Sequence, residues 1–527
     1  GAGGACGQGA LGGRDVPGRG ARGPGGGPLA RSFFFDCPMT AVQRESFVLT
    51  GRSVAVLLLV YALVWLGSYW VTALAAPGDN VEQLIWIHSL ELGYFKHPPM
   101  PTWIMAVAAA IFGPSIGLTY ALGGLLTLGS LAIFWKLLCQ MRGKAYATVA
   151  LLAALCITFY CGRLYYYNHN VVMMLWIALA VVLTWQVTIK PSLWAWALLG
   201  AVSGLAMLSK YQYVLALAVI GLWWLPIGAW KNPVHVKGTA LAAVVGLLVL
   251  SPHLYWLTTH DWMPMRYAER TSLGLHLDTA ARIKMSWKFA VDWIFNRCMP
   301  AWIVLGMAFW WGRRKSGTSP KSEQPRTTED QMLREFWLLW GLIPLLSMLV
   351  LCLFTGSFLH LQWGTAFMFL CVPAAMELVR NPAIWGSAAM VRTAWVSFGV
   401  LQALVLLQFW LASPMGLSGY KSSHQNHIPV DKIVEGIAPA AHKALGGPVD
   451  IIIGPQALAG RISMELPERP RVYVERNLQY SPWIHAQELP RSRIIEVAVL
   501  PDPLADGWIR AYGMWAWRPV KIAEGEH

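Results

Sequence analysis

Acidic and basic side chains gather in one short segment that follows the first long apolar run of the sequence. In "APGDNVEQLIWIHSLELGYFKHPPMPTW", the acids Asp79, Glu82 and Glu91 precede Lys96 and His97. A carboxylate that faces cations suits a reaction at phosphate, because the acid can position a nucleophile or a divalent cation while the cations neutralise a leaving group. The segment predicts Asp79 and Glu82 as catalytic acids, with Lys96 and His97 as phosphate-binding groups. The alternative is that the acids only solvate a loop end or cap a helix.

Lys210 is a further candidate for a phosphate contact. It stands in "LSKYQY" between two apolar runs, with few other charges nearby. An ammonium at the edge of a membrane core is costly and is a functional hypothesis by default. We expect Lys210 to bind a phosphate; the alternative is that its side chain extends to lipid headgroups.

Three further side chains are candidates for substrate contacts. Arg163 and Tyr167, in "GRLYYYNHN", could frame a sugar by hydrogen bonding and stacking, although tyrosines are also common at membrane interfaces. His253, in "SPHLYW", is either a substrate contact or a hydrogen-bonded packing residue.

The polar segment 258–288 contains two further arginines, Arg266 and Arg270, with Tyr267 beside the first. Arginine is well suited to bidentate phosphate contacts, so Arg266 and Arg270 are phosphate-binding candidates and Tyr267 a substrate contact. Solvated loop arginines are common as well. His360 is a weaker candidate in a later loop.

The composition decides the class of protein that must position these residues. Of the 527 residues, 56% are hydrophobic and 13% are charged, and mean hydropathy is +0.46. A soluble domain needs more polar cover than this. The net charge of +14 suits cationic loops against anionic lipid headgroups, and no arginine-rich helix or basic and aromatic patch indicates nucleic acid. Eight scattered cysteines without a CxxC pair do not suggest a disulfide framework.

The apolar runs predict a polytopic α-helical membrane protein with about eleven transmembrane helices. Each run is near the roughly 20 residues that a bilayer crossing needs. The predicted spans are approximately 53–75, 116–138, 146–162, 170–188, 193–209, 212–229, 238–257, 289–311, 335–355, 361–378 and 393–412. The shorter apolar run 100–113 is expected to be an interfacial or re-entrant helix.

Lysine and arginine set the orientation of these spans. With the N-terminus inside, every inner loop is dominated by basic residues, at 136–144, 190, 231–237, 313–321 and 380–392. The chemical candidates then fall on the outer face. An odd number of spans also places the C-terminal segment on the outer side of the membrane.

Two parts of the chain lie outside the predicted transmembrane domain, 53–412. Residues 1–52 are expected to be a disordered, cytoplasmic N-terminal segment. Its glycine-rich stretch 1–38 is expected to be an artefact upstream of the natural start; the alternative is a functional tail. The C-terminal segment 413–527 contains the β-rich runs "VDIIIG", "RVYVER" and "RIIEVAVL" and the helix-like "VDKIVEGIAPAAHKAL". It predicts a small α/β domain. The polar loop 312–333 predicts a cytoplasmic linker.

The first outer loop with its "GYFKHPPM" resembles the membrane glycosyltransferases of the GT-C fold. More narrowly, it is similar to the bacterial branch related to protein O-mannosyltransferases and to the lipid A aminoarabinose transferase. Other motifs match in the same order: "YYYNHNVVMMLW" a second outer loop, "GLAMLSKYQYVLAL" a Gly-Leu-Ala-x-Leu-x-Lys-Tyr stretch, and "SPHLYWLTTHDWMPMRYAER" a Pro-His-x-x-Trp-Leu…Tyr-Ala segment. The resemblance covers roughly residues 53–410 and is fainter beyond.

The resemblance implies roles for several residues. In the family an acid of the first outer loop is a base or a metal ligand, and that position falls on Asp79. A second acid often stands in the next outer loop, where this chain has Asn168 and Asn170, here substrate-binding candidates. The missing carboxylate leaves a divalent cation as an open alternative. The segment 258–288 resembles the loop that covers the site.

The function that the resemblance implies is transfer of a sugar from a polyprenyl-phosphate donor, usually with inversion, at the outer face. For a member of the bacterial branch, this is the periplasmic face of the inner membrane, where the C-terminal domain would also lie. The favoured acceptor is an envelope glycolipid, such as lipid A or the lipopolysaccharide core; a protein hydroxyl and another polyprenyl glycan are the alternatives. The aminoarabinose branch has Glu-Lys before its Pro-Pro, whereas this chain has Lys96-His97, so the acceptor is not carried over. No nucleotide cofactor is expected, since no Walker loop or GxGxxG motif occurs. The alternative function is a lipid or sugar transporter, although no internal repeat supports it.

Overall fold

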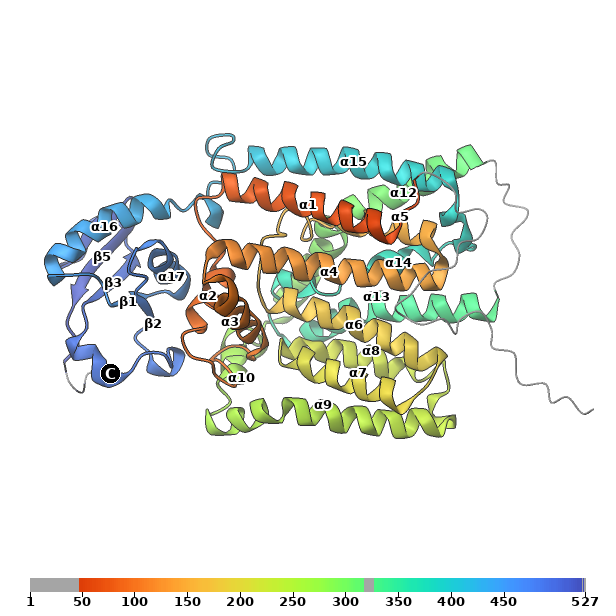
Figure 1. The fold of residues 1–527 in the computed structure, drawn as a ribbon, viewed down its shortest axis with the longest axis horizontal. Coiled ribbons are helices and arrows are strands. Elements are labelled where there is room, and N and C mark those ends of the chain that lie inside the picture. Colours follow the sequence, from red (N-terminus) through yellow and green to blue (C-terminus); the bar gives the residue numbers. More distant parts are fainter. Residues whose placement is uncertain (1–46, 317–326, 524, 526–527) are drawn as a thin grey trace, which may run out of the picture. The chain divides into compact units, whose positions relative to one another are not determined.

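The computed structural model describes residues 47–316, 327–523 and 525, and it is mostly helical (Figure 1). The predictions for residues 1–46 and for the middle of the 312–333 linker lie outside the described residues. The six cysteines within the described residues are all free.

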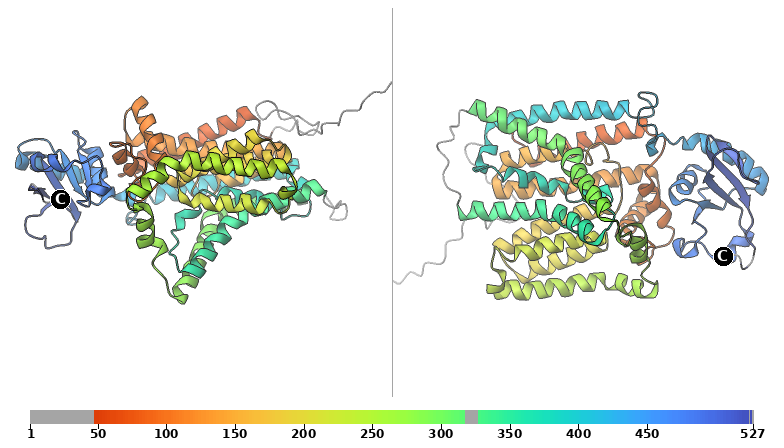
Figure 2. Two further views of the ribbon diagram at one scale, coloured as in Figure 1. Left: turned by 90° about the horizontal axis from the view of Figure 1, so that it is seen from below. Right: turned by 180° about the vertical axis from the view of Figure 1, so that it is seen from behind.

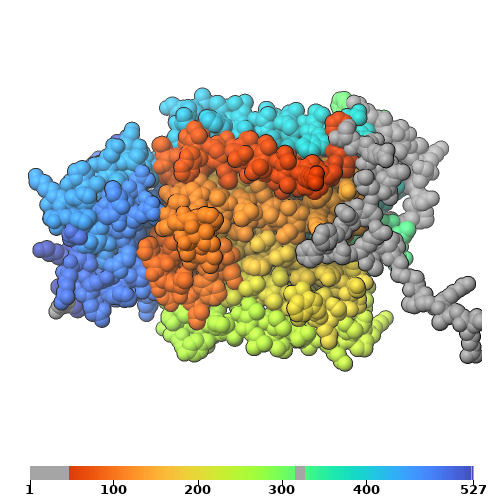
Figure 3. All heavy atoms as spheres, viewed as in Figure 1, coloured from red at the N-terminus to blue at the C-terminus, as the bar shows by residue number. Residues whose placement is uncertain are grey.

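Six helices are long and apolar enough to cross a membrane. They are α1 (Gly51–Thr72), α4 (Ile116–Arg142), α6 (His169–Ile189), α9 (Pro233–Thr259), α13 (Thr328–Thr355) and α15 (Ala388–Leu411). Many of their apolar side chains remain exposed, such as Val244, Leu247 and Leu248 on α9. Exposed apolar helix faces suit contact with lipid chains. Figure 3 shows α1 and α15 side by side along one edge of the bundle.

Shorter helices complete the bundle. These are α3 (Met100–Phe112), α5 (Lys144–Leu155), α7 (Leu193–Met207), η2 (Tyr211–Tyr213) with α8 (Val214–Trp223), α11 (Thr279–Val291) with η5 (Asp292–Arg297), and α12 (Met299–Ser316). α3 corresponds to the predicted interfacial helix, and it exposes Val107, Ile111 and Phe112. The fold class is therefore as predicted, while the count of about eleven spans stays a prediction.

The predicted span 361–378 is not a continuous helix, which corrects the expectation from its apolar run. The chain forms η7 (Leu361–Gly364), η8 (Met368–Leu370) and only the short α14 (Cys371–Met376). A Cβ on Gly364 would lie 2.6 Å from the Trp293 ring, so the backbone approaches that ring closely. The hydroxyl of Tyr160 donates to the carbonyl of Thr365 (2.6 Å) and accepts from the amide of Phe369 (3.1 Å). Irregular backbone is tolerated at membrane depth only where protein groups satisfy it in this way.

Two helices near the candidate site, α4 and α6, begin directly after a residue whose side chain caps them. Asn168 caps α6 by accepting from the amides of Asn170 (3.0 Å) and Val171 (3.1 Å). Ser115 caps α4 by accepting from the amide of Leu118 (3.2 Å). Such caps satisfy amides that have no partner inside the helix.

The segment 258–288, predicted to be an outer loop, is mostly helical. It contains α10 (Met263–Ala268), η4 (Glu269–Leu273) and most of α11. The amide of Leu277 donates to the carbonyl of Gly356 (2.9 Å), and that of Phe358 donates to the carbonyl of Ser272 (2.9 Å). Figure 2 shows this segment beside the end of α13, projecting together from the bundle.

The C-terminal segment forms a five-stranded mixed sheet with the order β2-β1-β3-β5-β4. Its elements are α16 (Val430–Leu445), β1 (Ile451–Gly454), α17 (Gln456–Glu465), β2 (Arg471–Val474), β3 (Ile494–Val499), β4 (Ile509–Tyr512) and β5 (Trp515–Val520). β1 is parallel to β2 and β3, and β5 is antiparallel to β3 and β4. The three β-rich runs and the helix expected from sequence are confirmed as β1, β2, β3 and α16.

Candidate active site

The site is built around α2 (Gly78–Trp86), a short helix that begins directly after Pro77. Asn80 holds α2 against the bundle: its amide donates to Thr119 Oγ1 and to the carbonyl of Tyr165, both at 2.8 Å. Its Oδ1 accepts from the amide of Tyr167 (3.0 Å). Because Asn80 is fully buried, these bonds fix where its neighbours on α2 point.

A cavity of about 490 Å³, here called the central pocket, opens beside α2. Its ionisable and amide lining comes from α2, the segment before α3, the start of α6 and the α7–η2 junction: Asp79, Glu82, Lys96, His97, Asn168, His169, Asn170 and Lys210. Its apolar lining comes mainly from α8, the 264–273 segment and the end of α13: Val214, Leu215, Pro264, Met265, Ala268, Leu273, Met348 and Leu351. One cavity thus offers an acid, cations and an apolar wall.

Asp79 lies in the first turn of α2 and is oriented from across the pocket. Asn168 donates from Nδ2 to Asp79 Oδ2 (3.0 Å). The side-chain amide of Asn168 cannot be flipped, because its Oδ1 already accepts hydrogen bonds from two backbone amides at the start of α6. The cap of α6 therefore aims an N–H group at one carboxylate oxygen and leaves the other oxygen of Asp79 for a ligand.

Glu82 and Lys96 form a salt bridge in which both side chains are largely buried. Burial raises the pKa of Glu82 to about 7, although Lys96 acts in the opposite direction. Burial alone would lower the pKa of Lys96, but the Glu82 carboxylate outweighs it and raises that pKa. With its amide in the orientation that satisfies both groups, Gln456 of α17 donates to Glu82 Oε2 (3.1 Å) and accepts from Trp86 Nε1 (2.8 Å).

Among the residues that the structure describes, no carboxylate forms an ion pair with Lys210. Its Nζ donates to Asn170 Oδ1 (2.6 Å) and lies 5.6 Å from the centre of the Trp363 ring. Burial lowers the pKa of Lys210 to about 7, and Asp79 offsets this only in part. An anion in the pocket would therefore stabilise the charged form of Lys210 strongly.

Two histidines of the pocket lining, His97 and His169, lie next to one another. The rings of His97 and His169 lie 3.9 Å apart at an angle of 35°. Burial lowers the pKa of His97 well below its usual value, and the nearby His169 and lysines add to the effect. Glu82, His97 and His169 each offer one ligand atom, and these atoms lie within 4.8 Å of one another, so this group could hold a metal ion. Asp79, the predicted metal ligand, is not a member of the group.

The predicted site residues are thus brought together in part. Asp79, Glu82, Lys96, His97, Asn168, Asn170, Lys210 and Tyr267 all line the central pocket. Arg163 lies instead in a separate cavity of about 200 Å³, together with Arg297, Lys421 and His424. The structure does not place Arg163 beside Asp79.

Four other predicted residues do not line the central pocket. The hydroxyl of Tyr167 donates to the carbonyl of Pro101 (2.6 Å), and His253 bonds to Tyr211 (2.7 Å) and to the carbonyl of Leu92 (2.6 Å). Both side chains are buried, which matches the packing alternative for His253.

Arg266 and Arg270 are the other two. Arg266 is exposed and pairs with Asp261 at 3.3 Å. Arg270 donates to the hydroxyl of Tyr480 (3.2 Å) in the C-terminal segment.

Sequence reasoning missed His169, Trp363, Gln212 and Gln456. His169 stands between the two asparagines that were singled out, so its position in "YNHN" was the available signal. Gln212 directly follows the "SKY" of Lys210, and its Nε2 donates to the carbonyl of Trp363 (2.8 Å). Nothing in the sequence pointed to Gln456, which comes from the C-terminal segment. His360, weighed as the weakest candidate, lines the central pocket and bonds to Ser272 (3.0 Å).

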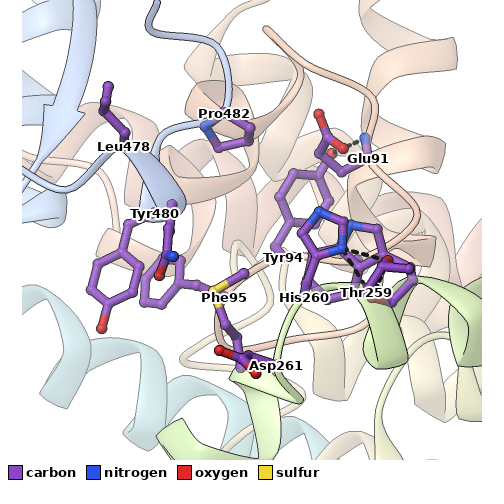
Figure 4. Close-up of a pocket in the computed structure, with 13 residues that line it drawn as sticks. Glu91, Tyr94, Phe95, Thr259, His260, Asp261, Leu478, Tyr480 and Pro482 are labelled. Carbon is purple, nitrogen blue, oxygen red and sulfur yellow. Dashed lines mark hydrogen bonds between the residues drawn. The ribbon is translucent and has the colours of Figure 1, made fainter. Parts of the chain in front are cut away.

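A neighbouring cavity of about 370 Å³ is lined by the end of α9, the segment 91–95 and residues 478–482. Figure 4 shows Tyr480 and Phe95 facing one another there, and their rings stack at 4.2 Å. Its charged lining is acidic, Glu91 and Asp261, and includes no lysine or arginine. This cavity is a poorer place for a phosphate than the central pocket.

Known proteins match both the sequence and the fold. The family model described as dolichyl-phosphate-mannose-protein mannosyltransferase matches residues 96–256, under a third of the chain. The lipid A galacturonosyltransferase RgtD of Rhizobium johnstonii is 24% identical over 38% of this chain and 43% of its own length. The lipopolysaccharide core galacturonosyltransferase RgtA of the same organism is 24% identical over 34% of this chain and 36% of its own. The matched stretch thus spans less than half of each relative.

The fold itself matches over nearly the whole chain. The crystal structure of ArnT from Cupriavidus metallidurans bound to undecaprenyl phosphate has a TM-score of 0.59 at 14% identity, and covers 88% of this chain and 97% of that one. The apo structure of the same protein gives 0.50 at 15% identity over the same shares. These matches confirm the resemblance predicted from the sequence, so the chain has the GT-C fold and is related to membrane glycosyltransferases of the protein O-mannosyltransferase and aminoarabinose transferase branch.

Proposed function

We propose that this protein transfers a sugar from a polyprenyl-phosphate donor to an envelope glycolipid of the lipid A or lipopolysaccharide core class. The observation that carries the proposal is the central pocket, where Asp79, Lys96 and Lys210 share one cavity with an apolar wall. A polyprenyl-phosphate sugar has the matching chemistry: an apolar chain, one phosphate and a polar sugar.

The two lysines fit the phosphate of such a donor. Lys96 keeps its charge because Glu82 pairs with it, and Lys210 gains charge when an anion approaches. Together they would stabilise the negative charge that develops on the phosphate as the sugar leaves. The apolar side chains of α8 and α13 would contact the first units of the polyprenyl chain.

Asp79 fits the role of the base. Asn168 binds its Oδ2, and its second oxygen would accept the proton of the acceptor's nucleophilic hydroxyl. The acceptor oxygen then forms a bond to the anomeric carbon while the bond between that carbon and the phosphate oxygen breaks. The polyprenyl phosphate leaves with the electron pair, and attack from the opposite face inverts the anomeric configuration.

The relatives support the choice of substrates. ArnT of Cupriavidus metallidurans binds undecaprenyl phosphate, and the two Rhizobium relatives are transferases that act on lipid A and on the lipopolysaccharide core. The shared fold and the lysines of the central pocket support a lipid-phosphate donor here. The sequence similarity to the Rhizobium proteins supports an envelope glycolipid acceptor.

We place the site at the periplasmic face of a bacterial inner membrane. Thr119, near the start of α4, contacts the α2 residue Asn80, while Arg142 ends the same helix. A helix of 27 residues is about 40 Å long, so the basic loop after Arg142 lies across the membrane from Asp79. Basic loops face the cytoplasm.

The test uses full-length protein in detergent or nanodiscs with a polyprenyl-phosphate-linked uronic acid or hexosamine, and with lipid A or rough lipopolysaccharide. Mass spectrometry measures a sugar-sized increment on the glycolipid. We expect Asp79→Asn to lose about 100-fold or more in rate, as loss of a general base does. The exposed Asp261 serves as the matched control, and Asp261→Asn should retain activity. A folded parent that makes no product, or an Asp79→Asn variant as active as the parent, would overturn the proposal. A transporter would move the lipid without adding sugar to the acceptor.

A further inference from the structure

Three metal-ligating side chains meet at one edge of the central pocket. Glu82 comes from α2, His97 from the segment before α3, and His169 from the start of α6. Their ligand atoms lie within 4.8 Å of one another, although the three residues come from separate elements. Distances of this size allow one ion to contact all three after small side-chain adjustments.

One of these ligands lacks a partner in the protein. His169 is 4% exposed, and its Nε2 has no hydrogen-bond partner within the described part of the chain. An unsatisfied polar atom that is buried costs about 1–3 kcal/mol, so such atoms call for an explanation. The ring of His97 lies close, with the ring centres 3.9 Å apart and the planes tilted by 35°, but it makes no hydrogen bond to His169 Nε2. A cation between the rings and Glu82 would supply the missing partner.

We infer that Glu82, His97 and His169 bind one divalent transition-metal ion of the zinc class. Two imidazole nitrogens and one carboxylate are a ligand set that zinc accepts, whereas magnesium and calcium prefer oxygen ligands. All three residues line the central pocket, so the remaining coordination position faces that cavity. A metal ion there would act as a Lewis acid on an oxygen that enters the pocket.

The salt bridge with Lys96 is compatible with this site. Lys96 contacts Oε2 of Glu82, and a carboxylate has two oxygens that a cation and an ammonium can share. Asp79 is separate from the site, because it is held by Asn168. The inference therefore assigns the cation to residues other than the one that the sequence suggested.

The test measures metal binding without any donor or acceptor. Full-length protein is stripped with a chelator, loaded with Zn²⁺, desalted and analysed for metal per chain, and the affinity is measured by competition with a chromogenic chelator. Loading with Co²⁺ adds a spectroscopic readout, since nitrogen ligands alter its visible bands. The variants are Glu82→Gln, His97→Gln and His169→Gln. The matched control is His235→Gln, because His235 is also a buried histidine with an unpartnered ring nitrogen but lies outside the group.

We expect about one Zn²⁺ per chain in the parent and in the control. Each ligand variant should bind at least about tenfold more weakly, since even loss of a residue that only supports a ligand costs about 10–100-fold. If His169→Gln does not elute as a folded species, the other two variants decide. A parent that retains no metal, ligand variants that bind like the parent, or an equal loss in His235→Gln would each overturn the inference. Because no sugar transfer is measured, these outcomes are independent of the proposed function.

Discussion

The pH dependence of donor binding is the sharpest consequence of the central pocket. Burial lowers the pKa of Lys210 to about 7, so this side chain is cationic below that pH and neutral above it. Affinity for an anionic donor should therefore fall as the pH rises through 7 and beyond. The phosphate of the donor is a diester, whose single charge does not change in this range, and a uronic acid carboxylate stays ionised as well. With a donor whose sugar carries no free amine, the change would therefore come from the protein.

The expected size follows from the protonated fraction of Lys210. If only the charged lysine binds the phosphate, affinity falls about fivefold from pH 7 to pH 8 and about tenfold for the next unit, because each pH unit corresponds to about 1.4 kcal/mol. Glu82 has a raised pKa of about 7 and gains negative charge over the same range, which adds to the effect. The other ionisable groups that line the pocket are Asp79, Lys96, His97, His169, Tyr211, Tyr267 and His360.

The assay is the dissociation constant of the polyprenyl-phosphate sugar between pH 6 and 9, measured in chelator-treated buffer so that no metal ion contributes. The parent is compared with Lys210→Met, which has no charge, and Lys210→Arg, whose guanidinium stays charged throughout. The variant Glu82→Gln shows how much of the pH dependence of the affinity comes from the Glu82 carboxylate. We expect a shallow slope in both Lys210 variants, with tight binding in Lys210→Arg and weak binding in Lys210→Met.

Two results would refute this reasoning. A parent whose affinity is constant from pH 7 to 9 would mean that Lys210 does not change its charge there. A slope of unchanged steepness in Lys210→Met would mean that another group causes it.

Two further predictions concern the scaffold. A Cβ on Gly460 would lie 2.5 Å from side-chain atoms of α2, so Gly460→Leu should push α17 away, lower the free energy of unfolding by about 1–3 kcal/mol and reduce sugar transfer. Gly399→Leu is the control, because nothing lies within 4 Å of a Cβ at that position. Thermal unfolding and a transfer assay are measured for both variants. Arg142 donates two 2.9 Å hydrogen bonds to the fully buried carboxylate of Glu377. Arg142→Met should lower the free energy of unfolding by about 3–5 kcal/mol, because it leaves a buried carboxylate without its cation. The double variant Arg142→Met/Glu377→Met should recover most of this loss in denaturation experiments.

Several of the pocket residues could be predicted because they stand at the ends of apolar runs. Asp79 follows the first run, Asn168 precedes α6, and Lys210 separates α7 from η2. Helix ends on one side of a membrane gather at one surface, so the sequence pattern was enough to place these three together. It was not enough to exclude Tyr167, whose hydroxyl turns to the carbonyl of Pro101.

The span 361–378 shows why hydropathy alone was insufficient. Its apolar composition predicted a helix, yet its backbone is irregular and surrounded by protein. The hydroxyl of Tyr160 satisfies two of its backbone groups, and this partner is distant in the chain. No local pattern shows that such a partner exists.

The contacts between the C-terminal segment and α2 could not be predicted from the sequence either. Arg461 donates from Nε to the carbonyl of Ala76 (2.8 Å), immediately before α2, and from Nη2 to Gln425 (2.9 Å). With Gln456 near Glu82, these contacts make the C-terminal segment part of the support of the site. Sequence reasoning treated it as a separate domain because its strands follow a different periodicity.

The family match includes some residues of the central pocket and leaves out others. The matched residues 96–256 include Lys96 and Lys210, but Asp79 and Glu82 precede them, and Trp363 follows. The cations of the pocket therefore lie inside the matched region, and the acids lie outside it. A role for Asp79 rests on where the fold places it, next to Asn168 and in the same cavity as the lysines. An experiment on Asp79 consequently tests the geometry of this chain and not only its relationship to other proteins.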